Sequence, residues 1–348
     1  MARQLYRSSR SFLLCFGISM PSVLGSCQEN RQVQLTPHEF KPMGLNSWDY
    51  NIEAKYEFTN IKEAIMIQFG MRVHDLCPKG PLLTVLDSIH DADIKHVQLA
   101  FGKSVSDYNF STGHYSAGFG NYIRRELDKR DIHIAVLGCY INPANPDEAA
   151  REAAVDRFIE HLKYAKRIGA DMVGTETGRF STDFKVTPLT KTEECYQTIL
   201  KSFRRIVRAA EQLGVTVGVE GVFDHTLHSP EMMARFLNDI DSEAVEIILD
   251  AVNLMTPDVE FDADGQAAII DKAFELYGNR ISVLHLKDFV FDGEKQFYRH
   301  PGEGHFHYEA LMRHIREKKP HIIGLLENSS PNRFVEDCAY LEAAFNKG

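Results

Sequence analysis

Four residues that can bind a divalent cation stand at the ends of four short apolar segments in the second half of the chain. They are Glu220, Asp250, His285 and Glu327, separated by 30, 35 and 42 residues. Three carboxylates brought together repel one another unless a cation or a proton lies between them. A shared metal ion is the simplest arrangement that keeps such charges in a buried place. The residue types therefore predict one divalent-cation site.

The segments that end in these residues are typical of buried parallel strands. They are Val215–Glu220, Val245–Asp250, Ile281–His285 and Ile322–Glu327, and their spacing leaves room for one helix and two loops each time. Four earlier runs bring the number of expected strands to eight: Ala64–Phe69, His96–Phe101, His133–Leu137 and Asp171–Thr175. This recurrence predicts an α/β protein with a single (β/α)8 TIM barrel, whose chemistry lies at the carboxyl ends of its strands.

Helical periodicity fills the intervals between these strands. Residues 147–168 place small and apolar side chains on one face, and Gly169 follows as the expected stop. A second helix is expected from Lys191 to Leu213, and Ser229 before Pro230 indicates the start of a third. The later helices are expected at Ala263–Tyr277, His307–Lys318 and Val335–Phe345.

The composition is that of an ordinary globular protein. The chain has 348 residues, of which 44% are hydrophobic and 25% charged, and its formal net charge is -10. A negative surface attracts a polyphosphate backbone poorly, so nucleic acid is not an expected partner.

The first 26 residues are typical of an export signal. Three arginines precede the mostly apolar stretch Ser11–Gly25, and Leu24–Cys27 (LGSC) matches the site at which bacterial lipoproteins are cleaved and acylated. We expect a cell-envelope lipoprotein held at the membrane only by lipid on Cys27. Residues 27–60 would form a tether or extension, and residues 61–348 the barrel. The alternative is translation from Met43 and a cytoplasmic protein.

Three short motifs add a family resemblance to the four strand-end residues. They are Leu249–Asn253 (LDAVN), Leu284–Asp288 (LHLKD) and Pro301–Gly304 (PGEG). From about residue 61 to its end the chain resembles the xylose-isomerase-like TIM-barrel superfamily of sugar phosphate isomerases and epimerases. Within it, the chain looks nearest to ketose 3-epimerases, hydroxypyruvate isomerases and inosose dehydratases. The resemblance implies that the four strand-end residues hold one manganese, magnesium or cobalt ion, and that the two glutamates also move protons.

The residue types agree with that chemistry. Three carboxylates and one imidazole suit Mn²⁺ best, with Mg²⁺ or Co²⁺ as alternatives and Zn²⁺ less favoured because no thiolate is present. A cation polarises a ketose carbonyl and stabilises the enediolate that forms when the neighbouring C–H proton leaves. Glu220 and Glu327, three strands apart around the ring, would flank the reacting carbon and exchange protons on opposite faces. The expected result is inversion at that carbon.

Five further residues are candidates for contact with the substrate: Glu176, His225, Asn253, Lys287 and Arg299. Lys287 faces the same side as His285 by strand alternation, although pairing with an acid is equally compatible with its position. Asn253 stands where relatives often carry a histidine that touches substrate. Each of the other three has a structural alternative, such as orienting a loop or lying exposed on one.

Other functions are compatible with the same barrel. They are an inosose-dehydratase-like lyase, a metal hydrolase resembling endonuclease IV and a barrel that binds sugar without turning it over. The hydrolase needs extra histidines for three metal ions, and Asn253 counts against it. A small sugar or cyclitol is the expected substrate, unphosphorylated if the protein is exported, and homo-oligomer formation stays open.

Overall fold

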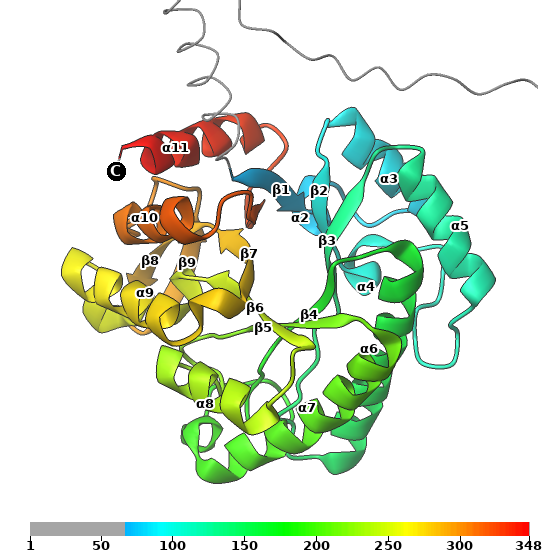
Figure 1. Cartoon of the computed structure of the whole chain (residues 1–348), viewed down its shortest axis with the longest axis horizontal. Coiled ribbons are helices and arrows are strands. Elements are labelled where there is room, and N and C mark those ends of the chain that lie inside the picture. The colour runs from blue at the N-terminus through cyan, green and yellow to red at the C-terminus, as the bar shows by residue number, and fades with distance from the viewer. Residues whose placement is uncertain (1–66, 348) are drawn as a thin grey trace, which may run out of the picture. The chain divides into compact units, whose positions relative to one another are not determined.

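The computed structural model describes residues 67–347, in which eight parallel strands close into a barrel (Figure 1). The expected TIM barrel is confirmed. The predicted lipoprotein signal, the predicted tether and the first three residues of the expected strand Ala64–Phe69 lie outside the described residues. The strands are β1 (Gln68–Arg72), β2 (His96–Leu99), β3 (His133–Gly138), β4 (Met172–Glu176), β5 (Thr216–Glu220), β6 (Val245–Asp250), β7 (Ile281–Leu286) and β10 (Ile323–Leu326).

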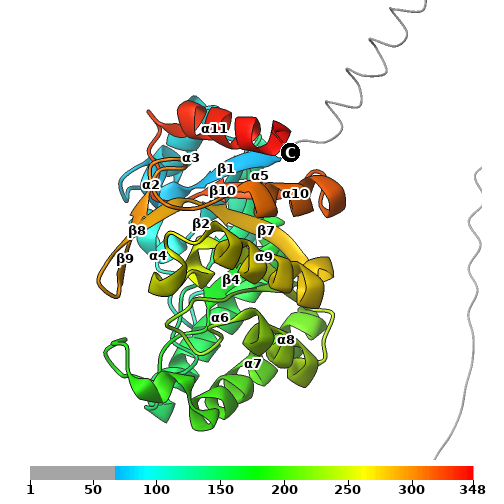
Figure 2. The same ribbon diagram turned by 90° about the vertical axis from the view of Figure 1, so that its left-hand side faces the viewer.

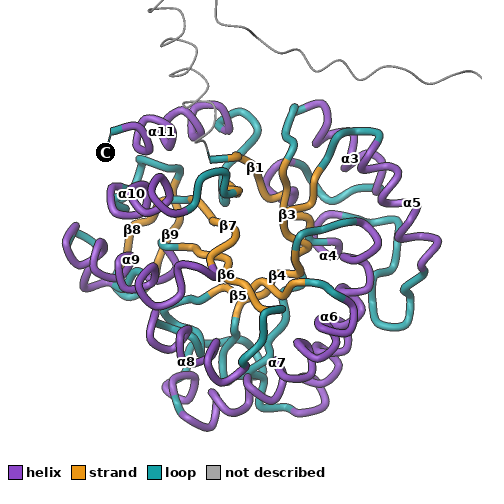
Figure 3. Tube along the Cα trace, viewed as in Figure 1, coloured by secondary structure: helices purple, strands orange, loops and turns teal. Residues whose placement is uncertain are grey.

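Eight helices form the outer layer around the strands (Figure 3). Two further short helices, α2 (Val73–Leu76) and α4 (Phe101–Ser104), follow β1 and β2 directly. Within residues 67–347, no helix combines the length and apolar character needed to cross a membrane. The outer helices are α3 (Leu82–Asp91), α5 (Ala117–Asp128), α6 (Glu148–Ile168), α7 (Glu193–Leu213), α8 (Pro230–Ile240), α9 (Ala263–Tyr277), α10 (Glu309–Lys318) and α11 (Phe334–Asn346).

The ends of the long helices are set by local chemistry. The Asp147 side chain accepts a hydrogen bond from the backbone N–H of Ala150 and caps α6. Gly169 ends that helix with a φ of 74°, which a residue without a Cβ adopts at little cost. Ser229 caps α8, and Pro230 occupies its first turn. The expected boundaries of these helices are confirmed.

The interior of the barrel is filled by a compact apolar group from five of its strands, β3, β4, β6, β7 and β10. It contains Ala135, Val136, Met172, Ile248, Val283 and Leu325. Glycine is required beside it, because a Cβ at Gly174 would lie 2.6 Å from Val136 and one at Gly218 2.5 Å from Met172. The barrel is therefore a packed core, and only the ends of its strands are open to ligands.

Two features differ from the sequence prediction. β1 runs on to Arg72, past the expected end at Phe69, because Met71 pairs with Leu326 of β10 and Arg72 with Gln98 of β2. A two-stranded antiparallel hairpin was also missed. It consists of β8 (Asp288–Asp292) and β9 (Lys295–Arg299), joined through Gly293 at a φ of 62°. The hairpin projects from the barrel at the end that also carries α2 and α4 (Figure 2).

Candidate metal centre and active site

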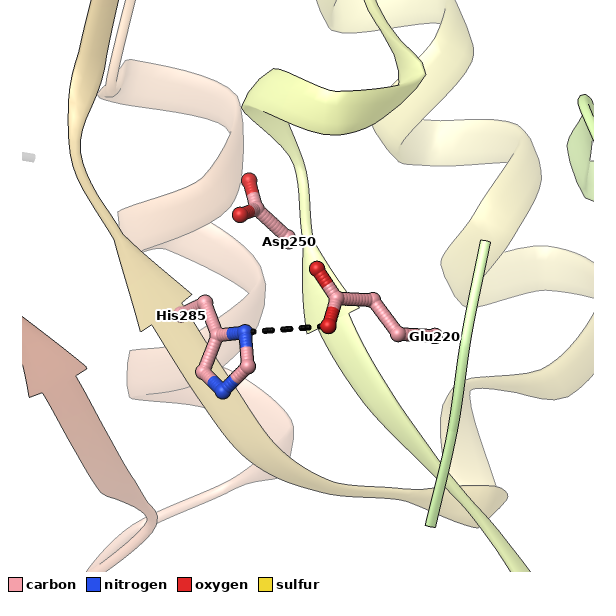
Figure 4. A group of neighbouring side chains, drawn as sticks. All are labelled: Glu220, Asp250 and His285. Atoms are coloured by element: carbon pink, nitrogen blue, oxygen red, sulfur yellow. Dashed lines mark ion pairs between the residues drawn. The ribbon is translucent and has the colours of Figure 1, made fainter. Parts of the chain in front are cut away.

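Three of the four predicted ligands converge at the mouth of the barrel. Glu220 is the last residue of β5, Asp250 is the last of β6, and His285 lies near the end of β7. One ligand atom from each lies within 4.8 Å of the other two, and all three side chains are buried. They point toward one another (Figure 4). The parallel register brings them together, because β6 pairs Asp250 directly with His285.

The hydrogen bonds of His285 prepare one ring nitrogen for a cation. Nε2 lies 2.7 Å from Oε1 of Gln98, a carbonyl oxygen that only accepts, so Nε2 carries the hydrogen. Nδ1 then faces Glu220 Oε2 at 3.3 Å and Glu327 Oε1 at 3.2 Å, yet it has no hydrogen-bond partner. A nitrogen lone pair aimed at two carboxylates is unfavourable unless a positive charge lies between them. The arrangement therefore fits a divalent cation.

The alternative source of positive charge is a proton on the imidazole itself. Burial lowers the pKa of His285, but the carboxylates of Glu327 and Glu220 outweigh burial and raise that pKa to about 9. Asp250 Oδ2 has a positive charge beside it already, because it forms a buried ion pair with the ammonium of Lys287. His285 Nδ1 is therefore the unpartnered atom of the cluster, whose carboxylates and imidazole are chemically suited to Mn²⁺, Mg²⁺ or Co²⁺.

Glu327, the fourth predicted ligand, lies just beyond β10 at the edge of this cluster. Its Oε1 is 3.0 Å from Nη1 of Arg72, and its Oε2 is 2.8 Å from Nζ of Lys287. Burial raises the pKa of Glu327. The positive charges of Lys287, His285 and Arg72 have a larger, opposite effect and hold this pKa well below its usual range. Glu327 is thus a stable carboxylate with two cationic partners beside the imidazole.

Lys287 places a positive charge inside the ring of acids. Its Nζ lies 2.6 Å from Asp250 Oδ2, and only 2% of the residue is exposed. The ammonium also lies 4.0 Å from the centre of the Tyr298 ring, in a cation–π contact. The structure thus brings Lys287 to the site and pairs it with acids, which is one of the two roles considered from the sequence, and contact with a substrate oxygen stays a prediction.

Asn253 orients two of the ligands. Its Nδ2 donates to Glu220 Oε1 at 2.7 Å, and its backbone N–H donates to Asp250 Oδ1 at 3.0 Å. Its side-chain oxygen accepts a long hydrogen bond of 3.4 Å from the hydroxyl of Tyr298. The Asn253 side chain therefore connects the ligand cluster to Tyr298 of the hairpin.

Glu176 and His225 line a cavity of about 920 Å³ that opens beside Asn253 and Tyr298. Glu176 ends β4 opposite Glu220 of β5. Burial and the charge of Glu220 raise the pKa of Glu176 to about 8, while 31% of its side chain stays open to solvent and water there moderates the shift. His225 Nδ1 lies 3.7 Å from Glu176 Oε2, and burial lowers the pKa of His225 to about 4.

Arg299 is not brought to the cluster. It lies exposed on β9, where its guanidinium donates to the backbone oxygen of Tyr298 at 2.8 Å. The PGEG loop after it is a structural element, because Asp288 accepts hydrogen bonds from the backbone N–H groups of Gly302 and Phe306. A Cβ at Gly304 would lie 2.3 Å from the Phe289 backbone oxygen, so the loop requires glycine there.

Three residues of the site were missed from the sequence: Arg72, Gln98 and Tyr298. Arg72 was hidden because β1 was expected to end at Phe69. Gln98 gave a usable signal, since it is a lone polar residue inside an apolar strand and is fully buried. Its amide nitrogen also donates to the hydroxyl of Tyr140. Tyr298 was missed because it lies on β9 of the hairpin, which was not expected from the sequence.

Comparison with known proteins places the chain among proteins of the same architecture. The sequence profile of the xylose isomerase-like TIM barrel family matches residues 86–344. No curated protein sequence matches the chain. Among solved structures, a D-tagatose 3-epimerase-like protein superimposes with a TM-score of 0.62 at 18% identity, over 80% of this chain and 97% of that one.

Two further structures share the fold. A 3-keto-D-glucoside 4-epimerase from E. coli gives a TM-score of 0.59 at 12% identity, over 80% of this chain and 100% of that one. A xylose isomerase-like TIM barrel protein from Mycobacterium smegmatis in complex with magnesium gives 0.58 at 13% identity, over 80% and 98%. At these identities the structures support the common fold only.

Proposed function

The chain belongs to the xylose isomerase-like TIM barrel family, and from that premise we propose that it is a divalent-cation-dependent isomerase or epimerase of a keto-sugar. The observation that supports this most directly is His285, whose Nδ1 lone pair faces two carboxylates while Gln98 holds the other ring nitrogen. A D-tagatose 3-epimerase-like protein and a 3-keto-D-glucoside 4-epimerase share this fold, which is compatible with the proposed reaction class.

Glu220, Asp250 and His285 would hold the cation, with Glu327 as the fourth ligand. Mn²⁺ is the ion that we expect, because carboxylate oxygens with one imidazole form a hard donor set. When bound, the cation supplies electrostatic stabilisation to the negative charge that develops on the substrate oxygens after a C–H proton leaves. The protein keeps these ligands in place through Asn253 and Gln98.

The two glutamates are the proposed proton carriers. Glu327 is kept ionised by Arg72 and Lys287, so it can accept a proton. Glu220 sits on the other side of His285, where Asn253 fixes the direction of its carboxylate. Proton removal by one carboxylate and return by the other, on opposite faces of the carbon, gives inversion.

Glu176 and His225 are proposed substrate-binding residues. The Glu176 carboxyl reaches the cavity wall beside Glu220 and can form a hydrogen bond with a sugar hydroxyl. Neutral His225 beside it offers a second polar contact at the cavity wall. Lys287 would contribute positive charge near substrate oxygens, and Arg299, exposed on β9, stays a prediction as a substrate contact.

The test is incorporation of solvent deuterium into a panel of ketoses and inososes in the presence of Mn²⁺. We expect exchange at the carbon next to the carbonyl of at least one substrate, with an epimer or isomer as product. The Asp250→Ala variant should show none. Absence of exchange across a panel that includes glycosylated keto-sugars, with one Mn²⁺ bound per chain, contradicts the proposal. Three bound zinc ions would instead favour the hydrolase.

A further inference from the structure

The cavity beside the proposed cation site is larger than one sugar ring. Its volume is about 920 Å³, and its wall includes Glu176, His225 and Asn253. Even if each of the twelve non-hydrogen atoms of a hexose took the roughly 30 Å³ of a water molecule, the sugar would fill only about 360 Å³. None of the four predicted ligands lines this cavity, so a keto-sugar bound at the ligand cluster would leave most of the cavity free for another part of the substrate.

The loop after β4 builds an aromatic wall on the far side of this cavity. Phe184 has a φ of 60°, a left-handed conformation that a bulky residue adopts only when its surroundings impose it. Arg179 imposes it here, because its Nη1 donates to the Phe184 backbone oxygen at 2.9 Å and its Nη2 donates to Asp224 Oδ2 at 2.6 Å. The guanidinium also stacks 4.9 Å from the centre of the Phe184 ring. The loop thus holds this ring at the cavity at a cost in backbone strain.

Phe184 contacts His225 in the wall of this cavity. The two rings meet edge to face with their centres 5.4 Å apart, and 38% of Phe184 stays exposed. The Arg179 guanidinium covers one face of the Phe184 ring, so the exposed part of the ring is the surface on which the C–H face of a pyranose or another ring would pack. Tyr298, which contacts Lys287 and is 40% exposed, offers a second aromatic surface at the end of the cavity nearest the cluster.

The charges on the wall favour an uncharged ligand rich in hydroxyl groups. Three carboxylates line the cavity and form no ion pair with any described residue: Asp258, Asp292 and Glu294. Carboxylates accept hydrogen bonds from sugar hydroxyls and repel a phosphate. Lys191 and Lys295 also reach the wall, so the cavity is mixed in charge and is not an anion site.

We propose that the substrate is a glycoside, in which the keto-sugar lies at the ligand cluster and a glycosidically linked second ring packs on Phe184. This inference rests on the proposed function and specifies its substrate class. The carboxylates of the cavity wall favour a sugar as the second ring. An aromatic aglycone would stack on Phe184 in the same way.

The experiment compares solvent deuterium exchange, in the presence of Mn²⁺, into three glycosides of one keto-sugar: methyl, phenyl and glycosyl. We expect kcat/KM for the glycosyl substrate to exceed that for the methyl substrate at least about tenfold, mainly through a lower KM. A phenyl glycoside that outperforms the glycosyl one identifies an aromatic aglycone. Equal kcat/KM for all three overturns the inference while leaving the proposed function intact, whereas no exchange into any of them removes the proposed function itself.

Variants of the loop after β4 test the role of Phe184 directly. Phe184→Leu should reduce the preference for the glycosyl over the methyl substrate about tenfold, and Phe184→Tyr, which keeps the ring, should retain it. Leu189→Ala is the matched control, because Leu189 is exposed nearby but does not line the cavity. Thermal unfolding and calorimetric titration with the unoxidised disaccharide show whether each variant is folded and binds. An unchanged preference in folded Phe184→Leu overturns the inference.

Discussion

The two sides of the barrel ring contribute different chemistry to the candidate site. The strands from β5 to β7 and the end of β10 carry Glu220, Asp250, His285 and Glu327, whereas β1 and β2 carry Arg72 and Gln98. The first group supplies candidate ligand atoms. The second supplies a counter-charge for Glu327 and a hydrogen bond to His285. Since β1 pairs with both β10 and β2, the second group reaches the first only when the barrel closes. Substitutions on the two sides should therefore have effects of different kind and size.

The largest effect is expected from the ligand side. Replacing Asp250 by alanine removes an oxygen from the cluster and leaves Lys287 without its closest partner. We expect loss of the bound cation and a fall in turnover to background, measured by metal analysis and deuterium exchange. Asp128→Ala, an exposed change on α5, is the control. Full occupancy by the cation in Asp250→Ala would remove Asp250 from the ligand set.

The next largest effect separates proton transfer from cation binding. Glu220→Gln and Glu327→Gln should each reduce turnover by roughly 10²–10⁴-fold while some cation binding persists, because an amide oxygen ligates weakly but accepts no proton. One variant should still exchange the substrate proton with solvent on the face of the remaining glutamate. If both variants with bound cation epimerise at nearly the original rate, the proton carriers are other residues, with Glu176 the first to examine.

A smaller effect is expected from the supporting side. Gln98→Leu removes the acceptor for His285 Nε2 and should weaken cation affinity by roughly 10–100-fold without abolishing it, as loss of such partners does in other metal sites. Gln98→Glu retains an acceptor and should bind the cation better than Gln98→Leu does. Gln197→Leu, on the surface of α7, is the control. Equal affinity in Gln98→Leu and the original protein would mean that His285 does not depend on Gln98.

The smallest effect concerns the opposite end of the barrel. His133 begins β3, and its Nε2 lies 2.9 Å from Asp171 Oδ1. This hydrogen bond raises the pKa of His133 above 6.5, although burial and Arg124 lower it, and His96 contacts the other ring nitrogen at 3.0 Å. The pair therefore stabilises the fold fully below pH 6.5 and loses that contribution as the pH rises through the raised pKa.

Because both side chains are more than a third exposed, the difference should stay below about 1 kcal/mol. Denaturant unfolding of His133→Gln at pH 5.5 and pH 8.5 measures it, and the variant should be less stable than the original protein only at the lower pH. Its cation affinity should not change. A lower affinity would show that the two ends of the barrel are coupled.

The fold was largely readable from the sequence because the strands are apolar runs separated by amphipathic helices, several of which carry side-chain caps. Residues 147–168 illustrate this, since Asp147 and Gly169 set both ends of α6 by local chemistry. The hairpin β8–β9 was missed even though Asp292 and Gly293 form a common turn dipeptide. Its strands pair only with each other and add nothing to the barrel pattern that organised the prediction.

The site was readable in part. Asp250 and His285 could be identified because ionisable residues at the ends of buried strands need partners, and residue type alone signals this. Gln98 gives only a weak signal, as a lone polar residue in an apolar strand, and Arg72 gives none. Their roles come from His285 and Glu327, which lie more than 180 residues away along the chain. Contacts of that kind are fixed by the register between β1, β2 and β10, which single-sequence patterns do not determine.

The buried charge of Lys287 affects whether the protein must bind a metal ion before it can fold. Its ammonium, together with Arg72 and the imidazolium form of His285, balances the three buried carboxylates from within the chain. In structural zinc domains the ion is needed for folding, and chelators unfold them. Here the polypeptide brings its own compensation, so we expect the barrel to fold without a bound ion. If it binds the proposed cation, the occupancy of the site would then follow the supply of metal around the folded protein.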